Sequence, residues 1–296
     1  MSEKNVVMQT RYHPFTASPF RKNNQYNELL PRQSLAQYVR CFWGSEPACT
    51  DMIQNRQGEL VIPDTCVDII YHIDYTENKV TGGFCGINDR SFYAVDNSVA
   101  GHVTATFAIR FYAWEAYVFA QDSFRSTANG FYEVGSRFAW LDRALRPNLL
   151  ELQTLQEKVS FAERLLLEKL QNAKENKTVR YAVNTILIQK GSLDISKLAK
   201  ASFVSSRQLE RLFHEYVGIT PKKLSNLIRY QLLWRDILYE PDFEVLNAVH
   251  QYGYTDQSHL LHAFKRFHSM DIRSAKRLAY ENVANLQDIL YGNIIN

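Results

Sequence analysis

The last third of the chain contains one pattern twice, and this repeat constrains the fold more than any other feature of the sequence. The two copies read LDISKLAKASFVSSRQLERLF at 193–213 and FEVLNAVHQYGYTDQSHLLHAF at 243–264. In each copy, a short apolar helix is expected to lead through a tight turn into a second helix that opens with small polar residues. The repeat therefore predicts two helix-turn-helix motifs in tandem, an arrangement suited to two neighbouring grooves of DNA.

The first copy has well-marked helix boundaries. Asp194 and Ser205 stand where N-cap residues are expected, each directly before a helix. Leu209 and Phe213 share the inner face of the second helix. The outer face of this helix is expected to present Ser206, Arg207, Glu210 and Arg211. Arginine on such a face can bond bidentately to guanine in the major groove, so these residues are candidates for DNA binding.

The second copy follows a spacer. Pro221 is expected to begin a helix that runs to about Tyr239, and its span of roughly 28 Å is close to the ~34 Å helical repeat of DNA. Gly253 marks the next turn, and Thr255 or Asp256 is expected to cap the helix after it. The outer face of that helix is expected to present Gln257, Ser258, His262, Lys265 and Arg266. Glutamine there suits adenine, whereas the lysine and arginine suit phosphate.

Charge is divided unequally between this region and the rest of the chain. Residues 174–280 hold 17 Lys and Arg against 10 Asp and Glu, and the remaining residues hold 17 against 21. The basic surplus coincides with the repeat, and it favours contact with phosphate.

The N-terminal half shows a different pattern. Residues 37–112 contain short apolar or alternating runs rich in Val, Ile, Phe and Tyr, which predict strands of a barrel or sandwich. Beyond residue 113 the leucines take helical spacing, and Ser160 with Glu163 has the form of a capping box. We therefore predict an α+β protein of two domains. The predicted parts are a β-rich regulatory domain ending in helices at 1–172, a linker at 173–178, an all-α DNA-binding domain at 179–280 and a tail at 281–296.

The C-terminal half resembles the DNA-binding domain of the AraC/XylS family of bacterial transcription regulators. The first copy matches that family at Leu198, Ala199, Ser205, Leu209, Arg211, Phe213, Gly218 and Pro221. The second copy matches at Gly253, Tyr254, Asp256, Gln257, Ser258, His259, Phe264, Lys265 and Arg266. The resemblance implies that DNA is read mainly by Arg207, Glu210, Arg211, Gln257, Ser258 and His262.

The second copy departs from the family pattern. Ser269 and Ile272 stand where the family has Gly and Pro, and Val249 replaces a small alanine. Leu261 and His262 replace a pair that is more often polar and basic. We therefore expect the first motif to supply more base discrimination and the second to supply more anchoring to phosphate.

The N-terminal half also resembles a known domain, the β-rich regulatory domain of one group of AraC-like proteins. The similar segments are YVRCFWG, VIPDTCVDIIYHI, GGFCGI and FAIRFYAWEAYVFA. This resemblance implies a double-stranded β-helix or similar barrel, followed by helices that can form a homodimer. Aromatic residues are either barrel core or the lining of an apolar effector pocket, for which the candidates are Phe42, Trp43, Tyr71, Phe107 and Phe111.

Other classes of protein find little support in the sequence. His13, His72 and His102 stand alone rather than in the His-x-His arrangement of a barrel metal site, and no P-loop, dinucleotide fingerprint or nucleophile elbow occurs. We expect no metal, no cofactor and no enzymatic activity. No apolar run of 18 residues and no signal segment is present, so a cytoplasmic protein without membrane contact is expected.

Together these features predict a sequence-specific, DNA-binding transcription regulator whose activity is modulated by a small molecule in the N-terminal half. Its expected partners are double-stranded DNA, an effector, a second copy of the chain and, for an activator, RNA polymerase. Two alternatives stay open. One is an AraC-like regulator controlled by dimerisation or a protein partner without a ligand, and the more remote one is a barrel-type enzyme fused to a DNA-binding module.

Overall fold

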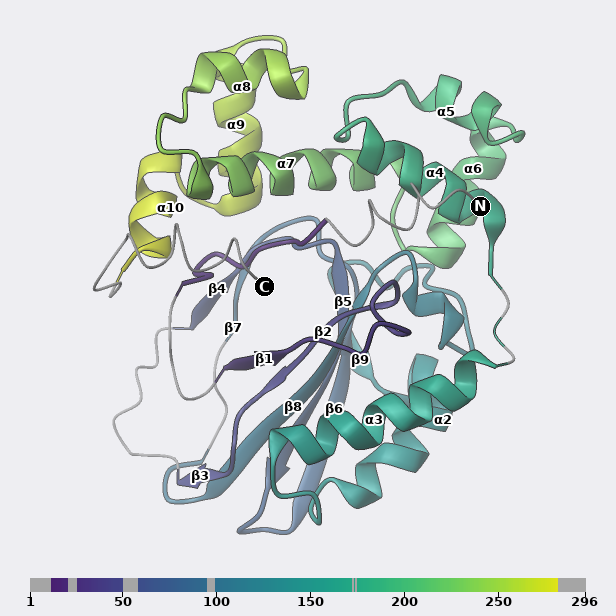
Figure 1. The fold of residues 1–296 in the computed structure, drawn as a ribbon, viewed down its shortest axis with the longest axis vertical. Coiled ribbons are helices and arrows are strands. Elements are labelled where there is room, and N and C mark those ends of the chain that lie inside the picture. Colours follow the sequence, from purple (N-terminus) through teal and green to yellow (C-terminus); the bar gives the residue numbers. More distant parts are fainter. Residues whose placement is uncertain are drawn as a thin grey trace.

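The computed structural model describes residues 12–20, 26–49, 58–94, 99–171, 173 and 175–281. The N-terminal half is built on a β-sheet, and the C-terminal half is a group of helices that lies above the sheet in Figure 1. The prediction of an α+β protein, with a strand-rich half followed by a helical half, is thereby confirmed. The predicted domain boundaries stay predictions, and residues 282–296 of the predicted tail lie outside the described residues.

The main sheet has the strand order β1-β2-β8-β5-β6-β9, and β3 pairs with β8 beyond the end of β2. These strands are β1 (Asn27–Leu29), β2 (Val39–Gly44), β3 (Ala48–Cys49), β5 (Cys66–Asp74), β6 (Lys79–Cys85), β8 (Val103–Tyr112) and β9 (Phe131–Glu133). A second, smaller sheet pairs β4 (Glu59–Val61) with β7 (Phe92–Ala94). All pairs are antiparallel, and the central pair aligns Cys66 of β5 with Tyr112 of β8.

The main sheet is not closed into the predicted barrel. Its edges are β1 and β9, and these do not pair with each other within the described part of the chain. The alternation of apolar and polar residues predicts that a strand exists, but closure depends on a pairing between two distant edge strands. The residue pattern of a single strand does not predict which distant strand it pairs with.

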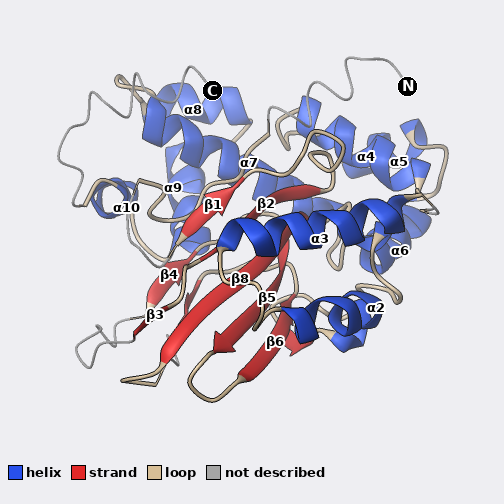
Figure 2. Ribbon diagram, turned by 60° about the horizontal axis from the view of Figure 1, so that its bottom comes forward, coloured by secondary structure: helices blue, strands red, loops and turns tan. Residues whose placement is uncertain are grey.

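Alternation gives the sheet one apolar face, which α2 (Gly135–Leu145) and α3 (Leu155–Leu170) cover in Figure 2. Phe111 stacks on Phe138 of α2 with ring centroids 6.0 Å apart. The short 3-10 helices η1 (Ala116–Val118) and η2 (Arg146–Asn148) complete this half. The capping box of α3 is formed by Thr154 and Glu157, so the predicted box at Ser160 is wrong, and that serine lies inside the helix.

The helical half is arranged around one long helix. Its elements are α4 (Lys177–Ile188), α5 (Ile195–Ala201), α6 (Ser206–Tyr216), α7 (Pro221–Tyr239), α8 (Val245–Tyr252), α9 (Gln257–His268) and α10 (Ile272–Ala279). In Figure 1, α7 runs horizontally, with α4 to α6 at one end and α8 to α10 at the other. The predicted spacer helix and the two helix-turn-helix motifs on either side of it are confirmed. No described helix is long and apolar enough to cross a membrane.

Candidate nucleic-acid interface

The first helix-turn-helix motif consists of α5 and α6, and local capping fixes both helices. The carboxylate of Asp194 accepts a hydrogen bond from the backbone of Lys197 at 2.9 Å. The hydroxyl of Ser205 accepts one from the backbone of Gln208 at 3.2 Å. Each bond satisfies an N–H group that a helix start leaves without a partner, so the two helices begin where the sequence predicts.

Helix α6 presents its predicted outer face to solvent. Leu209 and Phe213 are fully buried against the rest of the helical half. The four candidate residues on the opposite side, Ser206, Arg207, Glu210 and Arg211, are all exposed. The first two turns of α6 are therefore free to enter a major groove, with two guanidinium groups one helical turn apart.

The second motif consists of α8 and α9. Gly253 ends α8 in the left-handed conformation, with φ of +65°, and the carboxylate of Asp256 caps α9 by accepting from the backbone of His259 at 2.8 Å. Of the two predicted caps, Asp256 is the one that forms. The candidates Gln257, Ser258, His262, Lys265 and Arg266 are all exposed. Lys265 and Arg266 lie in the last turn of α9, away from the end that would enter a groove.

Helix α9 ends in the left-handed backbone conformation that favours glycine, although the residue there is a serine. Ser269, at the family's glycine position, has φ of +63°, a left-handed conformation that costs a serine free energy. Ile272, at the family's proline position, is the first residue of α10, and Asp271 caps that helix by accepting from the backbone of Ser274 at 2.9 Å. The second motif therefore retains the geometry of the first although it has lost the residues that favour it.

The spacer helix α7 holds both motifs through buried side chains. Arg229 donates to the carbonyl of Gly191, before α5, at 3.0 Å. On the second motif, His268 stacks on Phe264 at 4.9 Å and lies against Trp234 at 4.5 Å between ring centroids. The hydroxyl of Tyr230 bonds Nδ1 of His268 at 2.8 Å, while Nε2 of that histidine is buried without a partner. Burial lowers the pKa of His268 to about 3, so this ring is neutral.

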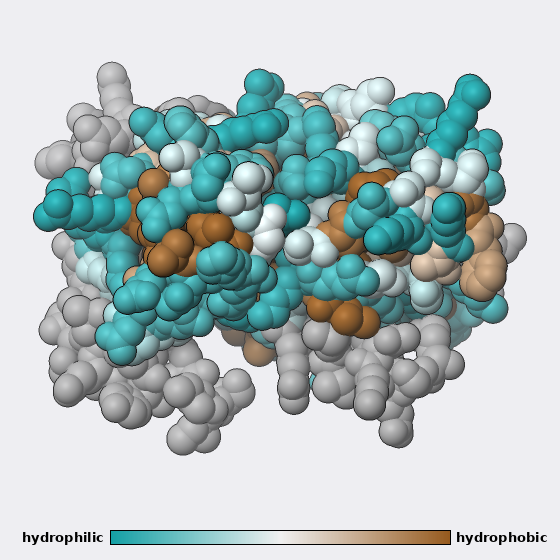
Figure 3. Space-filling view, turned by 90° about the horizontal axis from the view of Figure 1, so that it is seen from above, coloured by the Kyte–Doolittle hydropathy of each residue, from teal (hydrophilic) through white to brown (hydrophobic). Residues whose placement is uncertain are grey.

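Hydrophilic side chains cover most of the outer face of the helical half, with apolar areas between them (Figure 3). The exposed candidates of α6 and α9 belong to the two motifs that α7 joins. The base-contacting roles of these residues stay predictions.

The N-terminal half contacts the helical half at several places that sequence reasoning missed. Gln231 of α7 is buried, and its Nε2 donates to the carbonyl of Pro63 at 2.6 Å. Arg180 of α4 donates to both carboxylate oxygens of Glu115, through Nε at 3.2 Å and Nη2 at 2.7 Å. A third contact joins Lys223 Nζ to Asp89 at 2.6 Å. Helical periodicity predicts α4 and α7, but nothing in it reveals which polar residues face the other half.

The five candidate effector residues do not line one pocket. Phe42, Tyr71, Phe107 and Phe111 are fully buried in the core between the sheet and its covering helices. Phe42 and Phe107 stack at 6.4 Å, and the hydroxyl of Tyr71 bonds Asp142 of α2 at 3.0 Å. Trp43 follows Phe42 in β2 and so points to the opposite face of the sheet.

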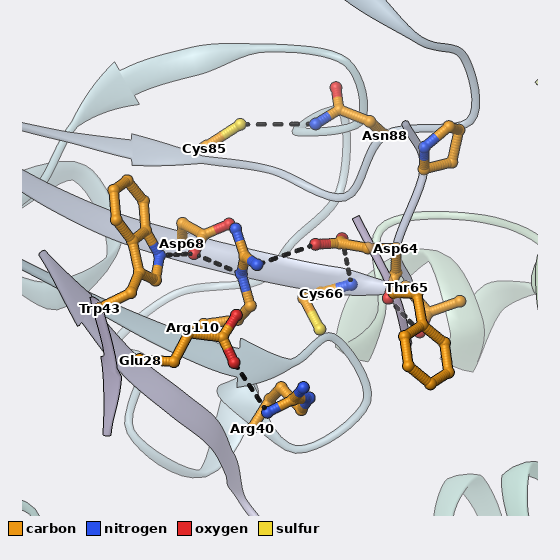
Figure 4. Close-up of polar contacts among 12 residues, drawn as sticks. Glu28, Arg40, Trp43, Asp64, Thr65, Cys66, Asp68, Cys85, Asn88 and Arg110 are labelled. Atoms are coloured by element: carbon orange, nitrogen blue, oxygen red, sulfur yellow. Dashed lines mark hydrogen bonds and ion pairs between the residues drawn. The ribbon is translucent and has the colours of Figure 1, made fainter. Parts of the chain in front are cut away.

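That opposite face carries a cluster of charged groups (Figure 4). Arg110 of β8 lies between two carboxylates, donating to Asp68 at 2.9 Å and pairing with Asp64 at 3.5 Å. The indole of Trp43 donates to the same oxygen of Asp68 at 2.9 Å, and the guanidinium of Arg110 lies over its ring at 5.6 Å. Burial raises the pKa of Asp64 despite the nearby arginine. Register explains the cluster, because Asp68 is paired with Arg110 across adjacent strands.

Four free cysteines accompany this half of the chain, of which Cys41, Cys66 and Cys85 lie near the cluster. Burial raises the pKa of Cys41 to about 12 and that of Cys85 to about 11, so these thiols stay protonated at neutral pH. Within the described residues, no group of three or more His, Cys, Asp or Glu side chains is arranged to hold a metal ion.

Family models match parts of both halves. A family model described as a helix-turn-helix domain matches residues 198–277, and a domain of unknown function, DUF6597, matches residues 27–131. No curated protein matches the chain.

Several solved structures are similar at low sequence identity. A transcriptional regulator with an AraC-type DNA-binding domain from Chromobacterium violaceum is 20% identical over 36% of this chain and 94% of its own, with a TM-score of 0.33. An apo variant of ToxT from Vibrio cholerae is 9% identical over 80% of this chain and 97% of its own, with a TM-score of 0.39. Wild-type ToxT bound to an unsaturated fatty acid is 8% identical over 88% of this chain and 98% of its own, with a TM-score of 0.37.

The matched helix-turn-helix segment contains α6, α7, α8 and α9 in full, so it spans the exposed helices of both motifs and the spacer that joins them. This helix-turn-helix domain follows a strand-rich half, which is the order predicted from the resemblance to the AraC/XylS family.

Proposed function

We propose that this protein recognises two successive major-groove faces on one side of DNA, with α6 in one groove and α9 in the next. The observation that carries this proposal is the arrangement on α7. Both helices expose the side that the sequence predicts to face DNA, while their other sides pack on the same buried spacer. A rigid spacer fixes the distance between the two readers, as groove spacing requires.

The two motifs have different roles in this proposal. Helix α6 offers Arg207 and Arg211 for base contacts, since arginine can bond two guanine acceptors at once. On α9, Leu261 is 43% exposed beside His262, where a polar reader would be expected. Its basic residues, Lys265 and Arg266, suit phosphate. The first motif thus discriminates among sequences, and the second anchors the protein.

Selection of bound sequences from random double-stranded DNA with the full chain tests this proposal. We expect two half-sites about one helical turn apart, roughly 10 base pairs from centre to centre. Arg211→Ala is expected to relax sequence preference at the first half-site by about 1–3 kcal/mol, whereas Gln257→Ala has a smaller effect at the second. Equal or larger loss of specificity from Gln257→Ala would contradict the division of roles, and selection of no common sequence would contradict the function itself.

We further propose that a small polar effector modulates DNA binding from the charged face of the sheet, rather than from the aromatic core. Asp64, which pairs with Arg110, directly follows Pro63, whose carbonyl is held by Gln231 of α7. A ligand that competes with Asp64 for Arg110 would therefore act next to Pro63, the residue that α7 contacts through Gln231. Thermal shifts with small carboxylates, amines and polyols, each followed by DNA titration, test this, and a ligand that raises the melting temperature is expected to change DNA affinity.

Control by dimerisation without a ligand is the second candidate. Helix α3 leaves Leu165, Leu167 and Leu170 partly exposed after packing on the sheet, and a second copy of the chain could cover them. Sedimentation of the full chain at micromolar concentration distinguishes the two forms of control. In either form we propose a cytoplasmic regulator without enzymatic activity.

A further inference from the structure

One residue of the first motif stands in a conformation and an environment that do not suit it. Phe203 lies in the turn between α5 and α6, and its side chain is 96% exposed. Its backbone is left-handed, with φ of +57°. The N–H of Phe203 donates to the carbonyl of Lys200 at 3.0 Å, and that of Val204 donates to Ala199 at 3.1 Å. These bonds close the end of α5 and require a left-handed residue at position 203.

Glycine would satisfy this turn at lower cost. A bulky side chain at positive φ costs free energy that glycine avoids, and a fully exposed ring gains nothing from burial. The turn of the second motif shows the difference, because its left-handed residue is Gly253 and the aromatic residue beside it, Tyr254, is buried. The phenylalanine of the first turn therefore lowers stability in the backbone without contributing to the core. A strained residue of this kind points to a function.

The surroundings of Phe203 indicate the kind of partner. Residues 195–209 contain no Asp or Glu, and the exposed Lys197, Lys200 and Arg207 lie on either side of the ring in sequence. Phe203 also precedes the N-cap Ser205 by only two residues, so it sits at the end of α6 that carries the exposed arginines. An apolar ring flanked in sequence by exposed cations, beside the start of a recognition helix, suits the edge of a DNA groove. There the thymine methyl is the apolar group and phosphates flank it.

We propose that Phe203 is a DNA-contacting residue whose ring packs on a thymine methyl group at the edge of the groove that α6 enters. This inference rests on the proposed function, since it needs α6 in the groove. Phe203 then contributes discrimination at a base pair next to those read by Arg207 and Arg211. Phenylalanine at position 203 is less favourable than glycine for the turn, and its ring makes a useful contact only when DNA is bound.

The test combines protein and DNA changes. The full chain and Phe203→Gly are titrated with the duplex recovered by selection and with duplexes in which each thymine in turn is replaced by deoxyuridine, which lacks only the methyl group. We expect Phe203→Gly to raise the melting temperature and to weaken binding about tenfold. At one thymine, deoxyuridine is expected to weaken binding of the wild type and to leave binding of Phe203→Gly unchanged.

Two controls separate the possible failures. Asn78→Gly relieves another left-handed residue, φ +50°, in the N-terminal half, and it is expected to leave DNA affinity unchanged. Selection from random DNA tests the proposed function: if no common sequence is recovered, that function fails, and Arg211→Ala tests whether α6 reads bases. If Arg211→Ala relaxes the preference but Phe203→Gly binds as tightly as the wild type, only the present inference is overturned, and the ring belongs to a protein contact. The inference is also overturned if Phe203→Gly binds more weakly but every deoxyuridine replacement affects the variant and the wild type equally.

Discussion

The side chain of Gln231 pairs with the backbone of Phe15, accepting from its N–H at 2.8 Å and donating to its carbonyl at 3.2 Å. The same amide nitrogen donates to the carbonyl of Pro63. Next to this contact, the indole of Trp234 donates to the carbonyl of Thr16 at 3.0 Å. Two separate segments of the N-terminal half, at residues 15–16 and at Pro63, are therefore hydrogen-bonded to α7, the helix between the two helix-turn-helix motifs.

Replacing Gln231 by leucine should destabilise the protein. The change leaves one backbone N–H and two carbonyl groups without their partner in a buried place, and we expect the free energy of unfolding to fall by about 2–4 kcal/mol. Urea unfolding measures the loss, and hydrogen exchange at residues 12–17 locates it. Gln208→Leu, at an exposed position of α6, is the matched control and should have little effect. Equal stability of the two variants would contradict the role of the buried amide.

The neutral ring of His268 predicts a loss of stability in acid. Its pKa is about 3 in the folded protein against 6.5 for an ordinary histidine. Between these values the unfolded chain binds a proton that the folded chain does not, so the free energy of unfolding is complete above pH 6.5 and falls as the pH decreases below it. At pH 5 the loss should be about 2 kcal/mol.

Unfolding of the wild type and of His268→Phe at pH 7.5 and pH 5 checks this prediction. The variant should be less sensitive to acid by the same amount, while His262→Gln, at an exposed position, should behave like the wild type. A wild-type protein whose stability changes no more than that of His268→Phe would contradict it.

The buried pair of Arg180 and Glu115 predicts a strong effect of removing one partner. Arg180→Met leaves the Glu115 carboxylate without its two guanidinium bonds, and it should cost about 3–5 kcal/mol. A surface pair offers the comparison, because Lys223 is half exposed where it meets Asp89, and Lys223→Ala should cost less than about 1 kcal/mol. Thermal unfolding of both variants measures the difference. Similar losses would mean that burial does not distinguish the two pairs.

The left-handed conformation of Ser269 predicts a stabilising substitution. Ser269→Gly removes the conflict between the side chain and φ of +63°, and we expect a gain of about 1 kcal/mol. The hydroxyl contact with Ser91 is exposed, so its loss should matter little. Chemical denaturation provides the measurement, and a variant less stable than the wild type would show that the Ser91 contact outweighs the strain.

The parts of the fold that the sequence predicts are those governed by neighbouring residues. Ser205, Asp256 and Pro221 act on the helix that begins beside them, so both motifs and the spacer could be placed from the pattern. The exposed faces of α6 and α9 follow from helical periodicity in the same way. A capping box needs only four residues, yet residues 154–163 alone contain two of the right form, and the structure uses the one at Thr154 because the helix begins there.

The parts that could not be predicted depend on contacts between distant residues. Alternation in β2 and β8 places Phe42 and Phe107 on one face, but it does not say that helices would cover that face and leave the charged one for Arg110. The open sheet and the contacts of Gln231 have the same cause. A glutamine inside the apolar run YQLLW was the available signal, and its partner lies 216 residues away.

That separation also determines when the molecule can be completed during synthesis. Phe15 is synthesised 216 residues before its partner Gln231, and Thr16 is synthesised 218 residues before Trp234. Until then the N-terminal segment lacks the helix that holds it, whereas each helix-turn-helix motif needs only neighbours close in sequence. The contacts of Phe15 and Thr16 with α7 therefore form only after the strand-rich half has been synthesised.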